Sequence, residues 1–174
     1  LALRGNLRKP GPIAPRRFLQ VLAGTNATRF TRGSGRLDLA DALVDPSNPL
    51  TPKVFVNRVW GWHFGSGLVG SPSNFGSLGQ KPTHPSLLEW LAADFVEHGW
   101  STKHLHRAIL LSATYRQSSA INKKAFASDG DNRLLWRFTP RRLDVEAWRD
   151  SLLSVTGELK LDLGGAPTED LRGS

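Results

Sequence analysis

The chemistry-bearing residues of this chain gather around one short run, NRVWGWH at residues 57–63. A glycine-rich segment, residues 65–84, follows it directly. If that segment folds back over the run, an amide, a guanidinium and an imidazole meet in a polar pocket suited to carboxylate or sugar hydroxyl groups. The alternative is that the same side chains bind the loop backbone and hold the loop in place. The candidate pocket residues are Asn57, Arg58, Asn74 and His84.

The histidines do not suggest a metal site. His63 falls on the apolar face of a predicted helix, where a hydrogen-bonded core histidine is the usual role. His104 and His106 are two residues apart in another predicted helix, so they point to different faces and cannot share an ion. His84 directly precedes a helix-starting proline and is interpreted as a contact at the helix start. We therefore predict no metal site and no cofactor in this chain.

Motifs of catalysis are also missing from the sequence. It contains no Ser-His-Asp signature, no phosphate-binding loop and no paired-carboxylate motif. It has no cysteine, which excludes disulfides, cysteine-ligated zinc and thiol chemistry. The sequence therefore does not support catalysis. The enzyme alternative is a hydrolase-like site, acting on a carbohydrate or an ester, beneath the glycine-rich loop.

A central helix has to position the run at residues 57–63. Thr51 is expected to cap the helix, and Pro52 suits its first position because a missing N–H costs nothing there. Gly65 and Gly67 are expected to end it in the left-handed conformation. The apolar stripe follows helical spacing at Val56, Val59, Trp60, His63 and Phe64.

The same patterns predict an all-α fold, a single multi-helix domain with a long ordered glycine-rich loop. Five helices are expected near residues 37–45, 52–64, 85–98, 102–115 and 140–156, with Ser101 and Thr139-Pro140 as start signals. Residues 118–131 are expected to form a surface loop. The candidate core and aromatic residues are Trp60, His63, Phe64, Trp90, Trp100 and Trp148.

The excess of basic residues lies in the N-terminal segment of the chain. The net charge is +8 in 174 residues, and residues 1–36 hold eight of the 23 basic residues and no acid. We predict an extended basic arm or linker at 1–33, a helical domain at 34–157 and a Gly/Pro-rich tail at 158–174. No run approaches the roughly 18 apolar residues of a membrane-spanning helix. No signal peptide is recognisable, and the absence of methionine suggests a fragment of a longer protein.

Nucleic-acid binding is a further alternative. Residues 85–117 have the outline of a helix-turn-helix, with Lys103, His104 and Arg107 on the second helix. The same stretch holds three acids against three Lys or Arg residues, whereas binding to phosphates requires a basic stripe. A helical hairpin that only buries apolar side chains is the commoner structure, so nucleic acid is disfavoured as a partner.

Long motifs extend over most of the chain. They include NRVWGWHFGSGLV at 57–69, PSNFG at 72–76, GWSTKHLHR at 99–107 and SATYR at 112–116. In these motifs the chain resembles the planctomycete-specific C-terminal domain of unknown function, and the similarity extends over residues 4–167. Members of that family continue beyond residues 164–167, so the resemblance implies that the domain is truncated here.

The resemblance implies where such a domain lies in its parent protein, and it implies no particular reaction. Such domains lie at the C-terminal end of large exported proteins, often behind a cytochrome-c-like segment, so haem is expected only in another domain of the parent. The resemblance implies a periplasmic or cell-surface location. We predict an uncharacterised helical module that packs against other domains of its parent or contacts a carbohydrate or small ligand.

Overall fold

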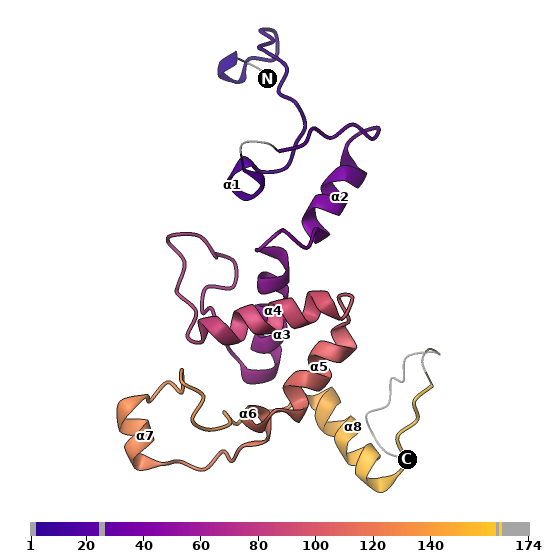
Figure 1. The fold of residues 1–174 in the computed structure, drawn as a ribbon. Coiled ribbons are helices and arrows are strands. Elements are labelled where there is room, and N and C mark those ends of the chain that lie inside the picture. Colours follow the sequence, from indigo (N-terminus) through magenta and orange to yellow (C-terminus); the bar gives the residue numbers. More distant parts are fainter. Residues whose placement is uncertain (1–2, 25–26, 163, 165–174) are drawn as a thin grey trace. The chain divides into compact units, whose positions relative to one another are not determined.

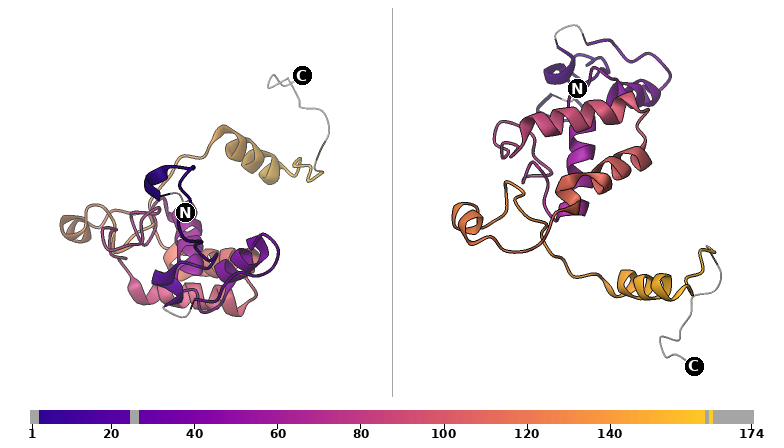
Figure 2. Two further views of the ribbon diagram at one scale, coloured as in Figure 1. Left: turned by 90° about the horizontal axis from the view of Figure 1, so that it is seen from above. Right: turned by 60° about the horizontal axis from the view of Figure 1, so that its bottom comes forward.

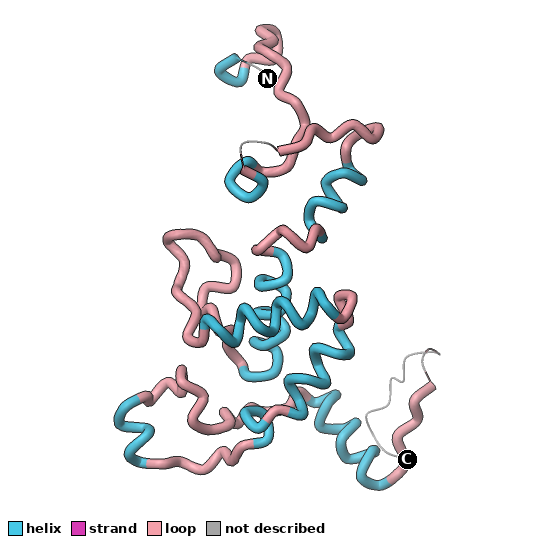
Figure 3. Tube along the Cα trace, viewed as in Figure 1, coloured by secondary structure: helices cyan, strands magenta, loops and turns pink. Residues whose placement is uncertain are grey.

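The computed structural model describes residues 3–24, 27–162 and 164 and divides into two compact units, residues 1–139 and 140–174. Within the described residues every regular element is helical and no strand occurs, which confirms the predicted all-α fold (Figure 3). The α-helices are α1 (Gln20–Ala23), α2 (Arg36–Val44), α3 (Thr51–Phe64), α4 (Pro85–Glu97), α5 (Thr102–Leu111), α6 (Ala113–Arg116), α7 (Lys123–Ser128) and α8 (Val145–Thr156), preceded by a 3-10 turn at Leu3–Gly5.

The core of the first unit forms around α3. Helix α4 runs across α3, and α5 packs against both of them (Figures 1 and 2). Phe55 on α3 stacks on Phe95 of α4, with ring centroids 4.9 Å apart. The buried apolar side chains of this core are those of Val56, Val59, Trp60, Phe64, Leu68, Val69, Leu88, Leu91, Phe95, Leu105 and Ile109.

The predicted stripe on α3 faces this core. Trp60 is 4% exposed and stacks on Phe64, with centroids 4.2 Å apart. Trp62, two residues further along the helix, is 58% exposed. His63 is half-buried at the edge of the stripe. Helix α3 ends at Gly65, whose φ of 88° lies in the left-handed region that glycine adopts without strain.

The start of α3 differs from the expectation. Thr51 is the first helical residue and its hydroxyl does not cap the helix; it accepts a hydrogen bond from Asn48 Nδ2 at 3.0 Å. Asn48 is buried, and its Oδ1 accepts a hydrogen bond from the Leu50 amide at 3.0 Å. The hydrogen bonds of Asn48 thus hold the turn before α3, and Thr51 is the first residue of the helix.

Two other helix boundaries also differ. Helix α8 does not begin at Thr139-Pro140, because Asp144 caps it by accepting a hydrogen bond from the Ala147 amide at 2.7 Å. A carboxylate at this position is a preferred cap and also complements the helix dipole. The predicted helix at 102–115 is divided at Ser112, which caps α6. The expected surface loop at 118–131 contains α7.

The predicted aromatic core residues separate into two groups. Trp60 and Phe64 are buried, and Trp100 is half-buried against Phe95 at a centroid distance of 5.3 Å. Trp90 and Trp148 are each 57% exposed, contrary to the expectation. Trp90 projects from the face of α4 opposite its buried side chains, and within the described part of the second unit α8 buries no residue.

The N-terminal segment is not extended throughout. The Phe30 amide donates to the Arg16 carbonyl at 2.8 Å, so the chain turns back on itself across α1. None of the described helices has the length and apolar character needed to span a bilayer.

Candidate functional site

The glycine-rich loop is anchored to α3 by Asn57. This side chain is 1% exposed, and its amide bonds both backbone groups of Val69: Nδ2 donates to the carbonyl at 3.1 Å and Oδ1 accepts from the amide at 2.8 Å. Gly67 lies so close that a Cβ there would fall 2.6 Å from Asn57 Nδ2. The Asn57 side chain therefore bonds Val69 as the backbone of a neighbouring strand would, and it fixes the position at which the loop begins.

The rest of the loop is organised by its own hydrogen bonds. Ser71 Oγ donates to the Asn74 carbonyl at 2.8 Å and accepts from the Gln80 amide at 2.8 Å. Asn74 Oδ1 accepts from the Gly76 amide at 3.0 Å. At the far end the Thr83 amide donates to the Leu68 carbonyl at 2.9 Å. The loop is thus closed at both ends, as the long ordered loops of functional sites usually are.

A hollow of about 440 Å³ lies between α3 and the start of this loop. Asn57 contributes to its wall but already bonds Val69 through both Nδ2 and Oδ1, whereas the side chains of Arg58 and Trp62 are exposed. Arg58 forms no hydrogen bond or ion pair with the described residues. The hydroxyl-bearing residues Ser66 and Ser73 also line the hollow. A cation, an aromatic face and hydroxyls therefore share one concave surface.

The four residues predicted to share a pocket do not all line this hollow. Asn57 and Arg58 do, but Asn74 and His84 are not among its lining residues. Asn74 is occupied inside the loop, and His84 precedes α4, where its Nδ1 lies 3.0 Å from Thr83 Oγ1. The exposed Trp62, which was not among the predicted pocket residues, does line the hollow. Whether the hollow binds a ligand stays a prediction.

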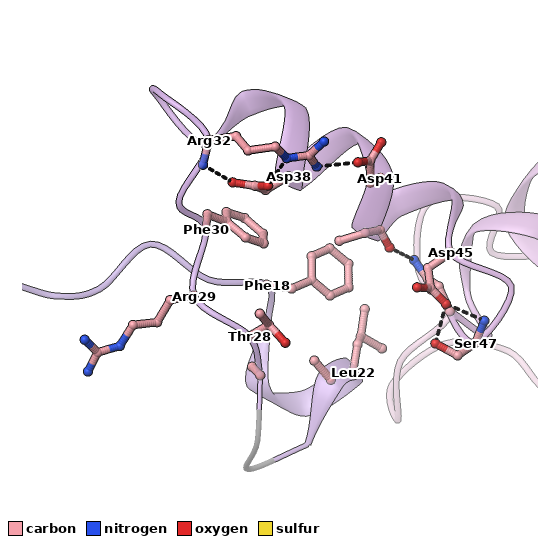
Figure 4. Close-up of a pocket in the computed structure, with 14 residues that line it drawn as sticks. Phe18, Leu22, Thr28, Arg29, Phe30, Arg32, Asp38, Asp41, Asp45 and Ser47 are labelled. Carbon is pink, nitrogen blue, oxygen red and sulfur yellow. Dashed lines mark hydrogen bonds and ion pairs between the residues drawn. The ribbon is translucent and has the colours of Figure 1, made fainter.

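A second pocket, of about 370 Å³, lies in the N-terminal segment (Figure 4). Phe18, Leu22 and Phe30 form its apolar wall, and Figure 4 shows Arg29 directed away from it. No sequence motif indicated this pocket, because it depends on how residues 16–30 fold back towards α2. The pattern that could have suggested it is Arg32 followed by Asp38 and Asp41, one helical turn apart.

The charged side chains of this second pocket are engaged with neighbours in the same segment. The guanidinium of Arg32 bonds both Asp41 and Asp38. The hydrogen bonds that Arg32 donates to Asp41 and Asp38 raise the pKa of Arg32, and the Arg32 side-chain bond lowers the pKa of Asp38. The Ser47 hydroxyl lowers the pKa of Asp45. These carboxylates therefore already have partners within the same segment.

The histidines on α5 point to different partners, as the spacing predicted. His106 Nδ1 lies 2.7 Å from His63 Nε2, and the His63 ring also meets Tyr115 edge-on with centroids 5.7 Å apart. His104 Nε2 lies 2.8 Å from Asp94 Oδ2. The group that His104 joins was not apparent from the sequence, because it forms only where α4 meets α5.

Comparison with known proteins gives a family and no activity. No curated protein and no solved structure matches the chain. The sequence pattern of one family, PSD1, described as "Protein of unknown function (DUF1553)", matches residues 35–172. That span includes α3, the glycine-rich loop and the α4–α5 pair. The chain belongs to the PSD1 family of proteins of unknown function.

Proposed function

We propose that this chain is a non-catalytic binding module of a larger exported protein, and that the hollow beside the glycine-rich loop contacts a carboxylated carbohydrate. The observation that carries the proposal is the exposure of Arg58 and Trp62 side by side on one concave surface, next to Asn57, whose side chain is bonded to Val69. Haem chemistry, where the parent has it, belongs to another domain.

Each group in the hollow has a matching part in such a ligand. A guanidinium binds a carboxylate through two parallel hydrogen bonds, which supply both energy and orientation. An exposed indole offers an apolar face to the C–H side of a sugar ring. The hydroxyl groups of Ser66 and Ser73 can exchange hydrogen bonds with sugar hydroxyls.

The groups around the hollow favour binding over catalysis. Bond cleavage by general acid–base catalysis requires a positioned proton donor and acceptor near the ligand. No Asp, Glu or His is among the residues that line this hollow.

The test is a calorimetric titration of the whole chain with an oligogalacturonate and with a neutral oligosaccharide of equal length. We expect saturable binding of the acidic ligand, weakened at least about tenfold by Arg58→Gln, because one charge-assisted pair contributes on the order of 1.5–3 kcal/mol. Arg107→Gln, an exposed arginine on α5, is the matched control and should change nothing.

Three results would argue against the proposal. Equal binding of the neutral oligosaccharide would mean that the Arg58 guanidinium contributes nothing to the affinity. Equal losses in Arg58→Gln and Arg107→Gln would indicate nonspecific attraction to a basic protein, which increasing salt would abolish. Release of reducing ends from the ligand would indicate the enzyme alternative.

A second candidate function is packing against other domains of the parent protein. Within the described part of the second unit, the apolar side chains of Val145, Trp148, Leu152 and Val155 are exposed on α8, by 67%, 57%, 48% and 88%. An apolar helical stripe of this size usually has a partner. Hydrogen exchange should find α8 amides better protected in the parent protein than in this chain. Equal protection would count against this function.

A further inference from the structure

One cluster of metal-binding side chain types lies outside the hollow. Asp94 stands in the last turn of α4, His98 follows directly after that helix, and His104 stands in the first turn of α5. One ligand atom from each residue lies within 4.8 Å of the other two. The sequence pattern is an aspartate, a histidine four residues later and a second histidine six residues after that.

The carboxylate of Asp94 contacts both imidazoles. His104 Nε2 is 2.8 Å from Asp94 Oδ2, and His98 Nδ1 is 3.3 Å from Asp94 Oδ1. The two rings stack with centroids 3.7 Å apart and an interplanar angle of 11°. Two ring nitrogens and one carboxylate oxygen therefore converge on a single small volume.

The turn between α4 and α5 is held by a backbone hydrogen bond and a helix cap. Gly99 turns the chain with a φ of 65°, and the Trp100 amide donates to the Phe95 carbonyl at 2.9 Å. Ser101 then caps α5 by accepting a hydrogen bond from the His104 amide at 3.2 Å. Two ligands on helices joined by a capped turn are better positioned than ligands on a loop.

Asp94 and His104 are partly buried in the cluster, whereas His98 is more accessible to solvent. The Asp94 side chain is 14% exposed and that of His104 is 33% exposed, so packing restrains them. The His98 side chain is 49% exposed, which leaves it free to turn and leaves an ion a route from solvent. In the present arrangement His98 Nδ1 donates to the Asp94 backbone carbonyl at 2.8 Å, a bond that coordination through Nδ1 must replace.

We propose that Asp94, His98 and His104 form a binding site for a divalent transition-metal ion, with zinc as the reference ion. Imidazole and carboxylate ligands suit zinc, nickel and copper, whereas magnesium and calcium prefer oxygen ligands alone. Zinc bonds of about 2.0–2.1 Å place neighbouring ligand atoms about 3.3 Å apart, so the side chain of His98 has to move inward. Three protein ligands leave the fourth tetrahedral position to water.

Proton transfer accompanies the binding. Each ring nitrogen binds the ion through its lone pair, so a proton on that nitrogen moves to the other ring nitrogen or to solvent when the ion binds. Ligation by both histidines also ties α5 to the end of α4, so the bound ion should raise the melting temperature.

The experiment is a titration of the whole chain, first stripped with a chelator, with zinc chloride followed by calorimetry. Cobalt chloride, followed by visible absorption, reports the ligand geometry. We expect one ion per chain and a rise in melting temperature. His98→Gln, His104→Gln and Asp94→Asn should each weaken binding at least about tenfold, since even loss of an outer-shell partner costs 10–100-fold.

Two matched controls come from the same helices. His106→Gln lies on α5 but faces His63, and Glu97→Gln is an exposed acid in the last turn of α4. Both should bind zinc as the unchanged chain does. Circular dichroism verifies that each variant folds; if His104→Gln does not, the exposed His98 carries the test. Absence of saturable binding, or a loss in His106→Gln with none in His98→Gln, would overturn the proposal.

Discussion

Asn57 and Val69 are joined by a pair of hydrogen bonds, one in each direction, between a buried side-chain amide and the two polar groups of one backbone residue. This pair connects the middle of α3 to the first part of the glycine-rich loop. Because Asn57 is committed to the loop, the outward-facing Arg58 and Trp62 are left as the available groups of the hollow.

Replacement of Asn57 by Ala should destabilise the chain strongly. It leaves the amide and the carbonyl of Val69 buried without partners, and each unpaired group costs about 1–3 kcal/mol. Urea denaturation measures the change. Asn74→Ala is the control, because Asn74 is exposed and loses only a local bond to Gly76. Similar losses in the two variants would contradict the anchoring role of Asn57.

Trp60 and Trp62 should differ sharply in their contribution to stability. Trp60→Ala removes a 4%-exposed side chain stacked on Phe64 and should cost about 3–5 kcal/mol, which is comparable with the whole stability of a marginal domain. Trp62→Ala should cost less than about 2 kcal/mol because the side chain is 58% exposed. The reverse order in urea denaturation would mean that the stripe on α3 is misassigned.

Two glycines near Asn57 should respond oppositely to a methyl group. A Cβ on Gly67 would fall 2.7 Å from Asn57 Oδ1 and 2.8 Å from the Val69 carbonyl, so Gly67→Ala should destabilise the chain by about 1–3 kcal/mol. A Cβ on Gly61 meets its nearest neighbour at 3.4 Å, an ordinary contact. Gly61→Ala should be neutral or stabilise α3 by up to about 1 kcal/mol. Thermal unfolding of both variants decides between these outcomes.

The Arg32–Asp38 pair predicts a specific pH dependence. The Arg32 side-chain bond lowers the folded-state pKa of Asp38 below its usual value of 3.8, so its stabilising effect is complete above that value and is lost as the pH falls through the folded pKa. Carboxyl NMR titration should show the Asp38 pKa rising in Arg32→Gln.

Asp45 supplies the matched comparison for that titration. Its pKa is lowered by Ser47 and not by Arg32, so Ser47→Ala should raise the Asp45 pKa while leaving Asp38 unchanged. An Asp38 pKa that does not respond to Arg32→Gln would mean that the pair does not persist in solution.

The sequence predicted the parts of the fold that depend on local periodicity. Val56, Val59, Trp60 and Phe64 repeat at helical spacing, and all four are buried. Helix starts were less predictable where two caps competed. Thr139-Pro140 resembles a start signal as closely as Asp144 does, and only the bond from the Ala147 amide identifies the latter.

The sites depended on contacts that spacing does not encode. Asn57 could bind a ligand or the loop, and the choice depends on the approach of Val69, twelve residues away. The grouping of Asp94, His98 and His104 depends on the angle between α4 and α5. The N-terminal pocket depends on a backbone bond between Phe30 and Arg16 across a turn.

The central claim is that Trp62, beside Arg58, contacts the ligand, and saturation-transfer NMR with an oligogalacturonate tests it most directly. Trp90 on α4 is the matched control, because it is 57% exposed and Trp62 is 58% exposed. The account predicts saturation of the sugar-ring protons by the unchanged chain and by Trp90→Ala, and its loss in Trp62→Ala. Full transfer in Trp62→Ala, or loss in Trp90→Ala instead, would contradict it.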